Sequence, residues 1–334
     1  MNAPFYEAIF MERYLKRLDP SGNPVEFSRI IVGGSSRQMM NGLYDGTFFS
    51  ALSSYGINTF DLARMYQDAE LHFSRYLNSM DREKTTIITK CCHPTFGLFK
   101  RVNEKAALYD IEKSLRILNV GYVDLLLLHR DDPSKDIREI ITFMNSFIKK
   151  GYTRLIGVSN FDIERVKEAN RYAFEHHLEP FVVNEPQFSL AVRNHDPWHN
   201  GSKTITGTEH EEERKYLYHS RMLTLSYSSL ADGFLDGKYS HDDICFRKHL
   251  SSASRYAYYD KNNLKRLERA EILAKEKGVS VPQLCLAYDL NQGFDVCSVV
   301  NLSSVERIKE NVKAIDLSLS ENEISYLEGR STDF

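Results

Sequence analysis

The sequence predicts an α/β fold, namely a single-domain (β/α)8 TIM barrel in which eight parallel strands are surrounded by helices. Three observations predict it. Eight short runs rich in β-branched residues alternate with longer segments of helical periodicity. The length of 334 residues is common for one such barrel. No G-x-G-x-x-G turn occurs, although a doubly wound dinucleotide-binding sheet would usually carry one after its first strand.

The expected strands are separated by helical segments, and parallel neighbours in a sheet need such a crossover each time. In chain order, the strands are expected at Arg29–Val32, Ile57–Phe60, Thr86–Thr89, Val123–Leu128, Arg154–Val158, Phe181–Val183, Met222–Ser226 and Val296–Val300. The clearest helical periodicity lies in Val102–Leu118, Ile137–Lys149, Phe161–Phe174 and Val305–Val312.

Three segments exceed what a minimal barrel needs. Near the N-terminus, Asp19–Gly22 has the composition of a turn, which predicts a hairpin across the barrel floor. Ser189–Glu212 and Ala231–Asn262 are expected as long loops after the sixth and seventh strands, on the face where barrel active sites are built. We find no linker or repeat, so we expect one domain over residues 1–334 with its core at about 27–330.

Composition excludes several classes of protein. Lys and Arg number 43 against 46 Asp and Glu, a net charge of −3, which argues against nucleic acid as a main partner. No apolar run approaches the ~20 residues of a membrane span, and the first residues lack a secretory pattern. Five cysteines without C-x-x-C spacing are typical of free thiols, so we expect a cytoplasmic protein.

Four polar residues fall at or just beyond the ends of three successive strands: Asp61, Tyr66, Lys90 and His129. A lysine cation beside a tyrosine lowers the pKa of the phenol, and a carboxylate keeps that lysine charged. An imidazole can hold a carbonyl oxygen. Each residue alone has a structural interpretation, such as a helix cap for Asp61 or a surface charge cluster for His129. Together they predict a proton-donor set that polarises a carbonyl.

Five segments resemble, in order along the chain, the signatures of the aldo-keto reductase family. They are Gly56–Tyr66, Tyr122–His129, Gly157–Phe161, Tyr227–Leu230 and Arg307–Asn311. The resemblance covers about residues 27–330 and implies a (β/α)8 barrel whose nicotinamide coenzyme binds without a Rossmann motif. It also implies a catalytic tetrad of the four polar residues, in which Tyr66 is the proton donor.

The resemblance further implies a set of coenzyme-binding positions along one side of the barrel mouth. These are Ser159, Asn160 and Glu185 at the nicotinamide carboxamide, Tyr227 on its ring, Ser228 and Leu230 at the pyrophosphate, and Ser303, Arg307, Glu310 and Asn311 at the adenosine end.

Two departures from the family pattern affect the expected coenzyme contacts. Glu185 stands where the family usually has a glutamine, and a carboxylate can accept from the carboxamide but cannot donate to it. The basic residue usual before the Arg307 segment is absent. We therefore expect NADP(H) to be preferred moderately, with NAD(H) also used, and no metal.

The substrate itself is expected to be a small carbonyl compound, and Phe96 and Trp198 are candidates for its pocket. Tyr109 and Lys113 have the Y-x-x-x-K spacing of short-chain dehydrogenases, but they lie in a helical segment without the required glycine-rich turn.

Two rival functions stay open: a coenzyme-binding regulator resembling potassium-channel β-subunits, and a barrel isomerase. An isomerase would need metal ligands at several strand ends.

Overall fold

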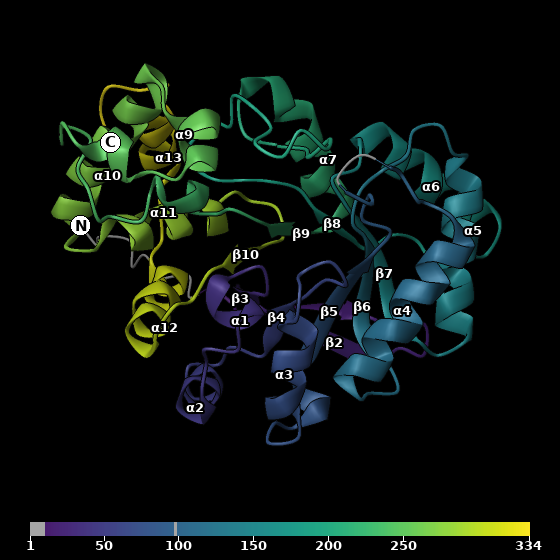
Figure 1. Cartoon of the computed structure of the whole chain (residues 1–334). Coiled ribbons are helices and arrows are strands. Elements are labelled where there is room, and N and C mark those ends of the chain that lie inside the picture. The colour runs from purple at the N-terminus through teal and green to yellow at the C-terminus, as the bar shows by residue number, and fades with distance from the viewer. Residues whose placement is uncertain (1–10, 97–98) are drawn as a thin grey trace, which may run out of the picture.

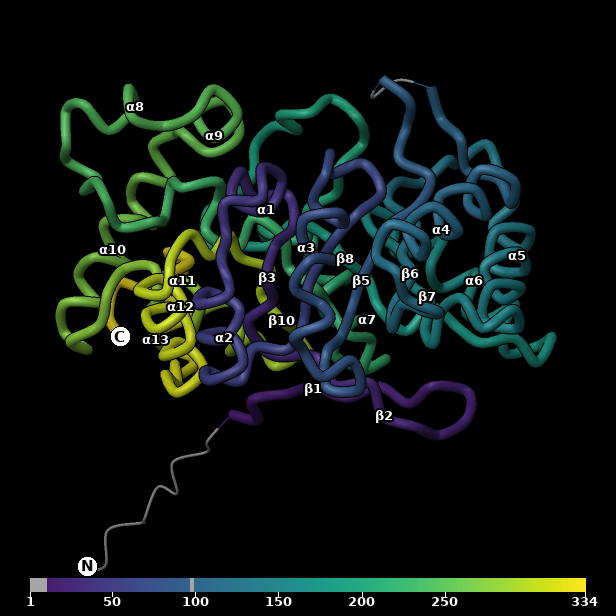
Figure 2. The backbone as a smooth tube through the Cα atoms, turned by 60° about the horizontal axis from the view of Figure 1, so that its bottom comes forward, coloured from purple at the N-terminus to yellow at the C-terminus, as the bar shows by residue number. Residues whose placement is uncertain are grey.

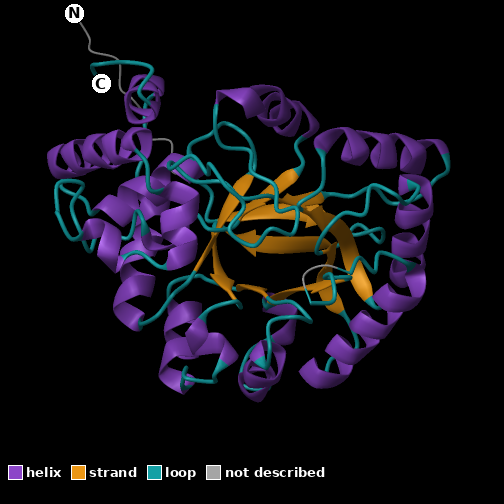
Figure 3. Ribbon diagram, turned by 45° about the horizontal axis from the view of Figure 1, so that its top comes forward, coloured by secondary structure: helices purple, strands orange, loops and turns teal. Residues whose placement is uncertain are grey.

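The computed structural model describes residues 11–96 and 99–334, and its eight parallel strands close into a barrel with helices around the outside (Figures 1 and 3). The order around the barrel is β10-β3-β4-β5-β6-β7-β8-β9. The strands are β3 (Ile30–Gly33), β4 (Thr59–Asp61), β5 (Thr86–Cys91), β6 (Val123–Leu128), β7 (Thr153–Ser159), β8 (Val183–Glu185), β9 (Leu223–Ser226) and β10 (Val296–Val300). The predicted TIM barrel is confirmed.

The barrel closes where β10 pairs with β3, with Val299 opposite Ile31. Apolar side chains fill its interior, among them Ile88, Leu125 and Leu225, and each is fully buried. A close backbone approach explains one glycine in this wall. At Gly157, a Cβ would lie 2.5 Å from the carbonyl oxygen of Val183, so a larger residue would push β7 and β8 apart.

The predicted N-terminal hairpin is confirmed. β1 (Tyr14–Leu18) and β2 (Pro24–Ser28) pair antiparallel beneath the barrel (Figure 2). Asp19 organises the turn, because one of its carboxylate oxygens accepts from the backbone N–H groups of Ser21 and Asn23. From β2, Val25 and Phe27 pack under the barrel interior. The hairpin therefore closes the floor and leaves the opposite end for a site.

Helices with one apolar face cover the outside of the strands, as α5 does with Ile140, Ile141 and Met144. The helices are α1 (Arg37–Met40), α2 (Gly46–Ser54), α3 (Ala69–Leu77), α4 (Glu104–Leu118), α5 (Ile137–Lys149), α6 (Ile163–Glu175), α7 (Glu211–Ser220), α8 (Phe246–His249), α9 (Ser252–Tyr258), α10 (Lys261–Lys277), α11 (Val281–Leu290), α12 (Val305–Val312) and α13 (Glu321–Glu328). Short 3-10 turns lie at η1 (Arg82–Lys84), η2 (Thr208–His210), η3 (Ala231–Gly233) and η4 (Lys313–Asp316).

Strand boundaries differ from the predicted ones by up to two residues. β4 begins at Thr59 rather than Ile57, and β8 runs over Val183–Glu185 rather than Phe181–Val183. Because both shifts move the strand toward its carboxyl end, Asp61 and Glu185 are the last residues of their strands. Their side chains are therefore held by the barrel wall itself.

The two long excursions follow β8 and β9, as expected, but the second is not a plain loop. It contains η3, α8 and α9 before α10 begins at Lys261. Ser251 caps α9 by accepting from the backbone N–H of Ser254, and the helix buries Ala257 and Tyr258. These helices are too short for their periodicity to be recognised in a segment so rich in Ser, Tyr and charge.

All five cysteines are free thiols, and only Cys245 is not fully buried. Within the part of the chain that the structure describes, no helix is both long and apolar enough to cross a membrane. Across the same residues, no three His, Cys, Asp or Glu side chains are grouped so that they could hold a metal ion.

Candidate active site

A cleft of about 1080 Å³ lies over the carboxyl ends of the strands, opposite the hairpin floor. It brings together most of the predicted site residues, although they come from distant parts of the chain. Those that line it are Asp61, Tyr66, His129, Ser159, Asn160, Glu185, Trp198, Tyr227, Ser228, Leu230, Ser303, Arg307 and Asn311.

Lys90 is the centre of the predicted tetrad and is fully buried in the barrel wall. Its ammonium group forms an ion pair with Asp61 at the end of β4 and donates to the phenol oxygen of Tyr66 at 3.3 Å. The ring of Tyr66 meets that of His129 edge to face, with centroids 5.6 Å apart. The four residues predicted from three strand ends therefore form one contiguous cluster.

The electrostatics of this cluster differ in one respect from the expectation. Burial raises the pKa of the Tyr66 phenol above its ordinary value, and the neighbouring Lys90 lowers it only in part. Burial alone would lower the pKa of Lys90, but Asp61 and Glu185 together raise it. Lys90 is therefore a permanent cation and Tyr66 is a protonated phenol at neutral pH, whereas the sequence led us to expect a lowered pKa for Tyr66.

His129 is held neutral. Burial lowers the pKa of its imidazole well below the ordinary value, and the cations of Arg130 and Lys90 lower it further. Its backbone N–H donates to the carbonyl of Cys91 at 2.9 Å, which fixes it beside β5. A neutral imidazole can both donate and accept a hydrogen bond, so His129 can hydrogen-bond to an oxygen atom while it carries no charge itself.

Glu185 ends β8 and makes a contact that sequence reasoning missed. One of its carboxyl oxygens lies 3.3 Å from the Lys90 ammonium, so the buried carboxyl groups of Asp61 and Glu185 both contact one cation. The other oxygen, Oε2, is buried without a hydrogen-bond partner among the described residues. Burial, reinforced by Asp61, raises the pKa of Glu185 to about 8. Near neutral pH the Glu185 carboxyl therefore largely keeps its proton.

We expect Glu185→Gln to flatten the pH dependence of stability. A carboxyl with a native pKa of about 8 and an unfolded pKa near ~4.3 holds a proton in the native state alone. The free energy of unfolding should therefore fall as pH rises between those values, and Glu185→Gln removes that fall. Chemical denaturation from about pH 5 to about pH 9 measures it. Glu83→Gln, at an exposed glutamate, is the matched control. Equal slopes in the wild type and in Glu185→Gln would contradict the assignment.

The predicted carboxamide residues form a hydrogen-bonded group beyond the tetrad. Asn160 follows β7 with a left-handed backbone, φ +62°. Its side-chain nitrogen donates to Ser159 Oγ at 2.8 Å, and its side-chain oxygen accepts from the Tyr227 hydroxyl at 2.7 Å. Ser159 Oγ in turn donates to the backbone carbonyl of Glu185 at 2.9 Å. This network fixes the positions of three cleft side chains from β7 and from just after β9.

The predicted phosphate and adenosine positions line the part of the same cleft that follows β9 and β10. Ser228, Leu230, Ser303, Arg307 and Asn311 line it, and Asn311 Oδ1 is buried without a hydrogen-bond partner among the described residues. The remaining predicted residue, Glu310, does not line the cleft. Its carboxylate pairs with the Arg307 guanidinium at 2.9 Å and so orients that cation.

A second cation in this part of the cleft was missed by sequence reasoning. Lys238 lines the cleft together with Arg307, although 69 residues separate them in the sequence (307 − 238). The Lys238 ammonium pairs with Asp236 at 3.1 Å, and Arg307 donates to the Asp236 backbone carbonyl at 3.5 Å. The excursion after β9 therefore supplies the basic neighbour that the segment before Arg307 lacks.

The two substrate-pocket candidates differ in position. Trp198 lines the cleft, and its ring centroid lies 6.1 Å from that of Tyr227. Phe96 is 89% exposed and is not among the residues that line the cleft. His93 does line it and packs against His129 with ring centroids 4.7 Å apart. The sequence signal that could have identified His93 as a cleft residue was its position two residues after the end of β5.

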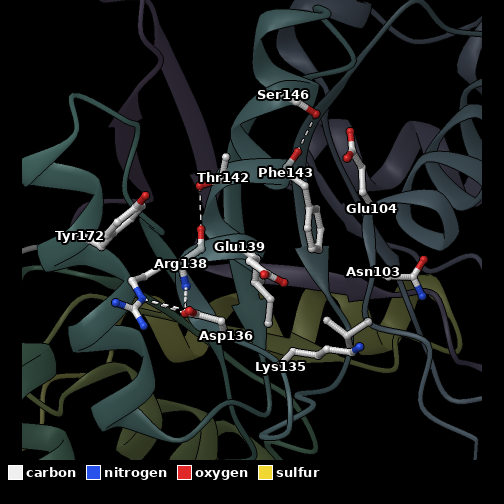
Figure 4. Close-up of a pocket in the computed structure, with 12 residues that line it drawn as sticks. Asn103, Glu104, Lys135, Asp136, Arg138, Glu139, Thr142, Phe143, Ser146 and Tyr172 are labelled. Carbon is white, nitrogen blue, oxygen red and sulfur yellow. Dashed lines mark hydrogen bonds and ion pairs between the residues drawn. The ribbon is translucent and has the colours of Figure 1, made fainter.

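Another pocket, of about 700 Å³, lies on the outer surface between α4, α5 and α6 (Figure 4). Asn103, Lys135, Phe143 and Tyr172 are among its lining residues. Asp136 in its wall already accepts from Arg138 at 2.9 Å. No tetrad residue lines this pocket, so the chemistry belongs to the cleft.

Comparison with known proteins agrees with this geometry. The profile of the Aldo/keto reductase family matches residues 47–331. An aldo-keto reductase of Alternaria alternata is 27% identical over an alignment of 305 residues, and the match covers 82% of this chain and 78% of that protein. An Arabidopsis thaliana protein named "probable voltage-gated potassium channel subunit beta" is 28% identical over 279 residues, 79% of each chain.

Among solved structures, a thermostable aldo-keto reductase in complex with the inhibitor epalrestat superimposes with a TM-score of 0.66. It is 22% identical, and the match covers 95% of this chain and all of that one. This likeness supports the fold, while the profile match over most of the chain identifies the relationship. The chain therefore belongs to the aldo/keto reductase family.

Proposed function

We propose that the protein reduces an aldehyde or ketone to the alcohol with a nicotinamide coenzyme, and that Tyr66 donates the proton. The observation that carries the proposal is the Tyr66 hydroxyl 3.3 Å from a buried, permanently charged lysine, at the wall of a cleft that the cations of Lys238 and Arg307 also line. The first arrangement suits proton transfer to a carbonyl oxygen. The second suits a phosphorylated coenzyme.

The residues along the cleft fit NAD(P)H. Asn311 Oδ1 and Glu185 Oε2 are buried without a hydrogen-bond partner among the described residues, and both residues line the cleft. Asn311 Oδ1 suits an adenine amino group, and the Glu185 carboxyl, which is largely protonated near neutral pH, can both donate to and accept from a carboxamide. Arg307 and Lys238 suit phosphate oxygens. The bound coenzyme would supply the hydride, which is the one part of the chemistry that this chain's side chains cannot provide.

The protein's own groups then have separate tasks. His129, neutral, and the Tyr66 hydroxyl would hold the substrate oxygen, and the Tyr66 proton passes to that oxygen as negative charge develops on it. Lys90 stabilises the phenolate that remains, and Asp61 keeps Lys90 charged and in place. In the direction of alcohol oxidation, the same phenolate would accept the proton.

NADPH oxidation with a panel of aldehydes, ketones and quinones tests this function. We expect steady turnover with at least one class of carbonyl compound. The relative from Arabidopsis thaliana favours a second candidate, a coenzyme-binding regulatory subunit. That function predicts tight NADPH binding with, at most, one slow turnover for any carbonyl compound, so the same panel separates the two.

We further propose a preference for NADPH over NADH, and expect Arg307→Ala to remove most of it. One charge-assisted contact to a phosphate is worth ~1.5–3 kcal/mol, or roughly 10- to 150-fold in affinity. NADPH binding should weaken within that range, while NADH, which lacks the 2′-phosphate, should bind as before. Fluorescence quenching measures both affinities, and Lys309→Ala, at an exposed lysine of the same helix, is the control. Equal weakening of both coenzymes would show that Arg307 does not bind this phosphate.

A further inference from the structure

Arg130, directly after His129, is a buried cation with no carboxylate partner in the described part of the chain. It is 7% exposed and lines the cleft. Its guanidinium donates to two neutral oxygens, the His129 backbone carbonyl at 2.8 Å and Asn200 Oδ1 at 3.2 Å. The two acids that follow it in the sequence are paired elsewhere, Asp131 with Arg165 and Asp132 with Lys100.

A buried guanidinium without an anionic partner destabilises the folded protein unless a bound anion neutralises its charge. Buried charges in proteins are normally paired or bind a ligand of opposite charge, because removing an ion from water is expensive. A guanidinium also presents a planar fork of donors that fits a carboxylate or a phosphate. An unpaired arginine in a cleft wall therefore has the properties of an anion receptor.

The groups that face Arg130 do not neutralise it near pH 7. His129 is neutral, and burial together with Arg130 lowers the pKa of His93 to about 4. The positive charge of Arg130 lowers the pKa of the Glu185 carboxyl, but burial still raises that pKa to about 8, so Glu185 is largely protonated near pH 7. The nearby cation of Lys90 is paired with Asp61. A net positive charge therefore remains beside the tetrad.

The position of Arg130 distinguishes the substrate from the coenzyme as the source of the anion. Arg307 and Lys238 stand where the cleft is lined by residues after β9 and β10. Arg130 follows β6 and adjoins His129, which the proposed function places at the reacting carbonyl. Asn200 and Trp198, from the excursion after β8, line the cleft on this side as well.

We propose that Arg130 is a specificity-determining residue that binds an anionic group, a carboxylate or a phosphate, of the carbonyl substrate. This inference rests on the proposed function. It narrows the substrate class from any small aldehyde or ketone to carbonyl compounds that also carry a negative charge.

Matched substrates test the inference. We expect the wild type to have a kcat/KM about 10- to 100-fold higher for 4-carboxybenzaldehyde than for its neutral amide, 4-formylbenzamide, mainly through KM. Glyceraldehyde 3-phosphate against glyceraldehyde provides the phosphate arm, and the pair with the larger ratio identifies the anion. A ratio near one in the wild type for both pairs would overturn the proposal.

Three variants locate the effect. Arg130→Gln keeps hydrogen-bond donors for Asn200 and the His129 carbonyl but loses the charge, so we expect the ratio to fall to about one. Arg130→Lys keeps the charge and should retain part of the ratio. Lys100→Met, at a half-exposed cation paired with Asp132, should leave the ratio unchanged. An equal loss in Lys100→Met, or a main effect of Arg130→Gln on NADPH affinity, would contradict the assignment.

A binding measurement separates this inference from the proposed function. If no carbonyl compound is reduced, the proposed function fails, and the anion site is then judged by calorimetry with benzoate and benzamide in the NADP+-loaded protein. Stronger binding of benzoate that Arg130→Gln abolishes would support the site. Equal binding of benzoate and benzamide to the wild type would refute the anion site. This comparison needs only the wild-type protein, so it decides the question even if Arg130→Gln does not fold.

Discussion

Tyr66→Phe is expected to lower kcat for carbonyl reduction by about 10² or more, the scale of general acid catalysis. The phenylalanine keeps the ring packed against His129 but removes the hydroxyl that Lys90 contacts in the cleft. Coenzyme affinity should stay near the wild-type value, because the hydroxyl is not among the proposed coenzyme contacts. Steady-state kinetics with fluorescence titration of NADPH measures both quantities.

Tyr109→Phe is the matched control for this prediction. Tyr109 has a lysine, Lys113, near its ring, as Tyr66 has Lys90, but it lies 57% exposed on the outside of α4. Its loss should leave kcat unchanged. Full activity in Tyr66→Phe would show that another group donates the proton and that the tetrad is misassigned.

Lys90→Met should have the largest effect on stability as well as a large effect on rate. Removing one partner of a buried ion pair costs about 3–5 kcal/mol, and here Asp61 and Glu185 would be left together without their cation. Because burial raises the pKa of both carboxyls, the loss should be smaller at acidic pH, where they are protonated, and should grow as pH rises. Chemical denaturation across that pH range measures it.

The rate effect of Lys90→Met has a separate signature. Lys90 lowers the pKa of Tyr66, so without it any limb of the pH–rate profile that reports Tyr66 should move to higher pH. The double variant Lys90→Met with Asp61→Asn should recover much of the stability but not the activity. An unchanged limb, with the chemical step rate-limiting, would assign Lys90 a structural role alone.

The sequence was sufficient to predict the barrel and the proximity of the four proposed tetrad residues, for a physical reason. Parallel strands place their carboxyl ends on one face, so polar residues at three strand ends, such as Asp61, Lys90 and His129, had to converge there. Tyr66 follows within five residues of Asp61 and could not lie far away (66 − 61). These positions follow from strand order alone and need no knowledge of side-chain packing.

Other features depend on tertiary packing and were not predictable. Lys238 lines the same cleft as Arg307 because of the path that the excursion after β9 takes, and no spacing in the sequence encodes that path. Glu185 was interpreted only as a carboxamide ligand, and its ion-pair contact with Lys90, a cation that Asp61 also contacts, depends on how the side chains of two strand ends pack. Whether Arg130 pairs with its neighbour Asp131 or faces the cleft was likewise undetermined.

The central claim is that this cleft transfers hydride to a carbonyl carbon with Tyr66 as the proton donor. NADPH that carries deuterium at both C4 positions, incubated with the wild-type protein and 4-carboxybenzaldehyde, tests it most directly by mass spectrometry of the product. We expect an alcohol that carries one deuteron on the former carbonyl carbon, and almost none from Tyr66→Phe. NADPH that binds tightly yet yields no deuterated alcohol from this or any other carbonyl compound would contradict the account.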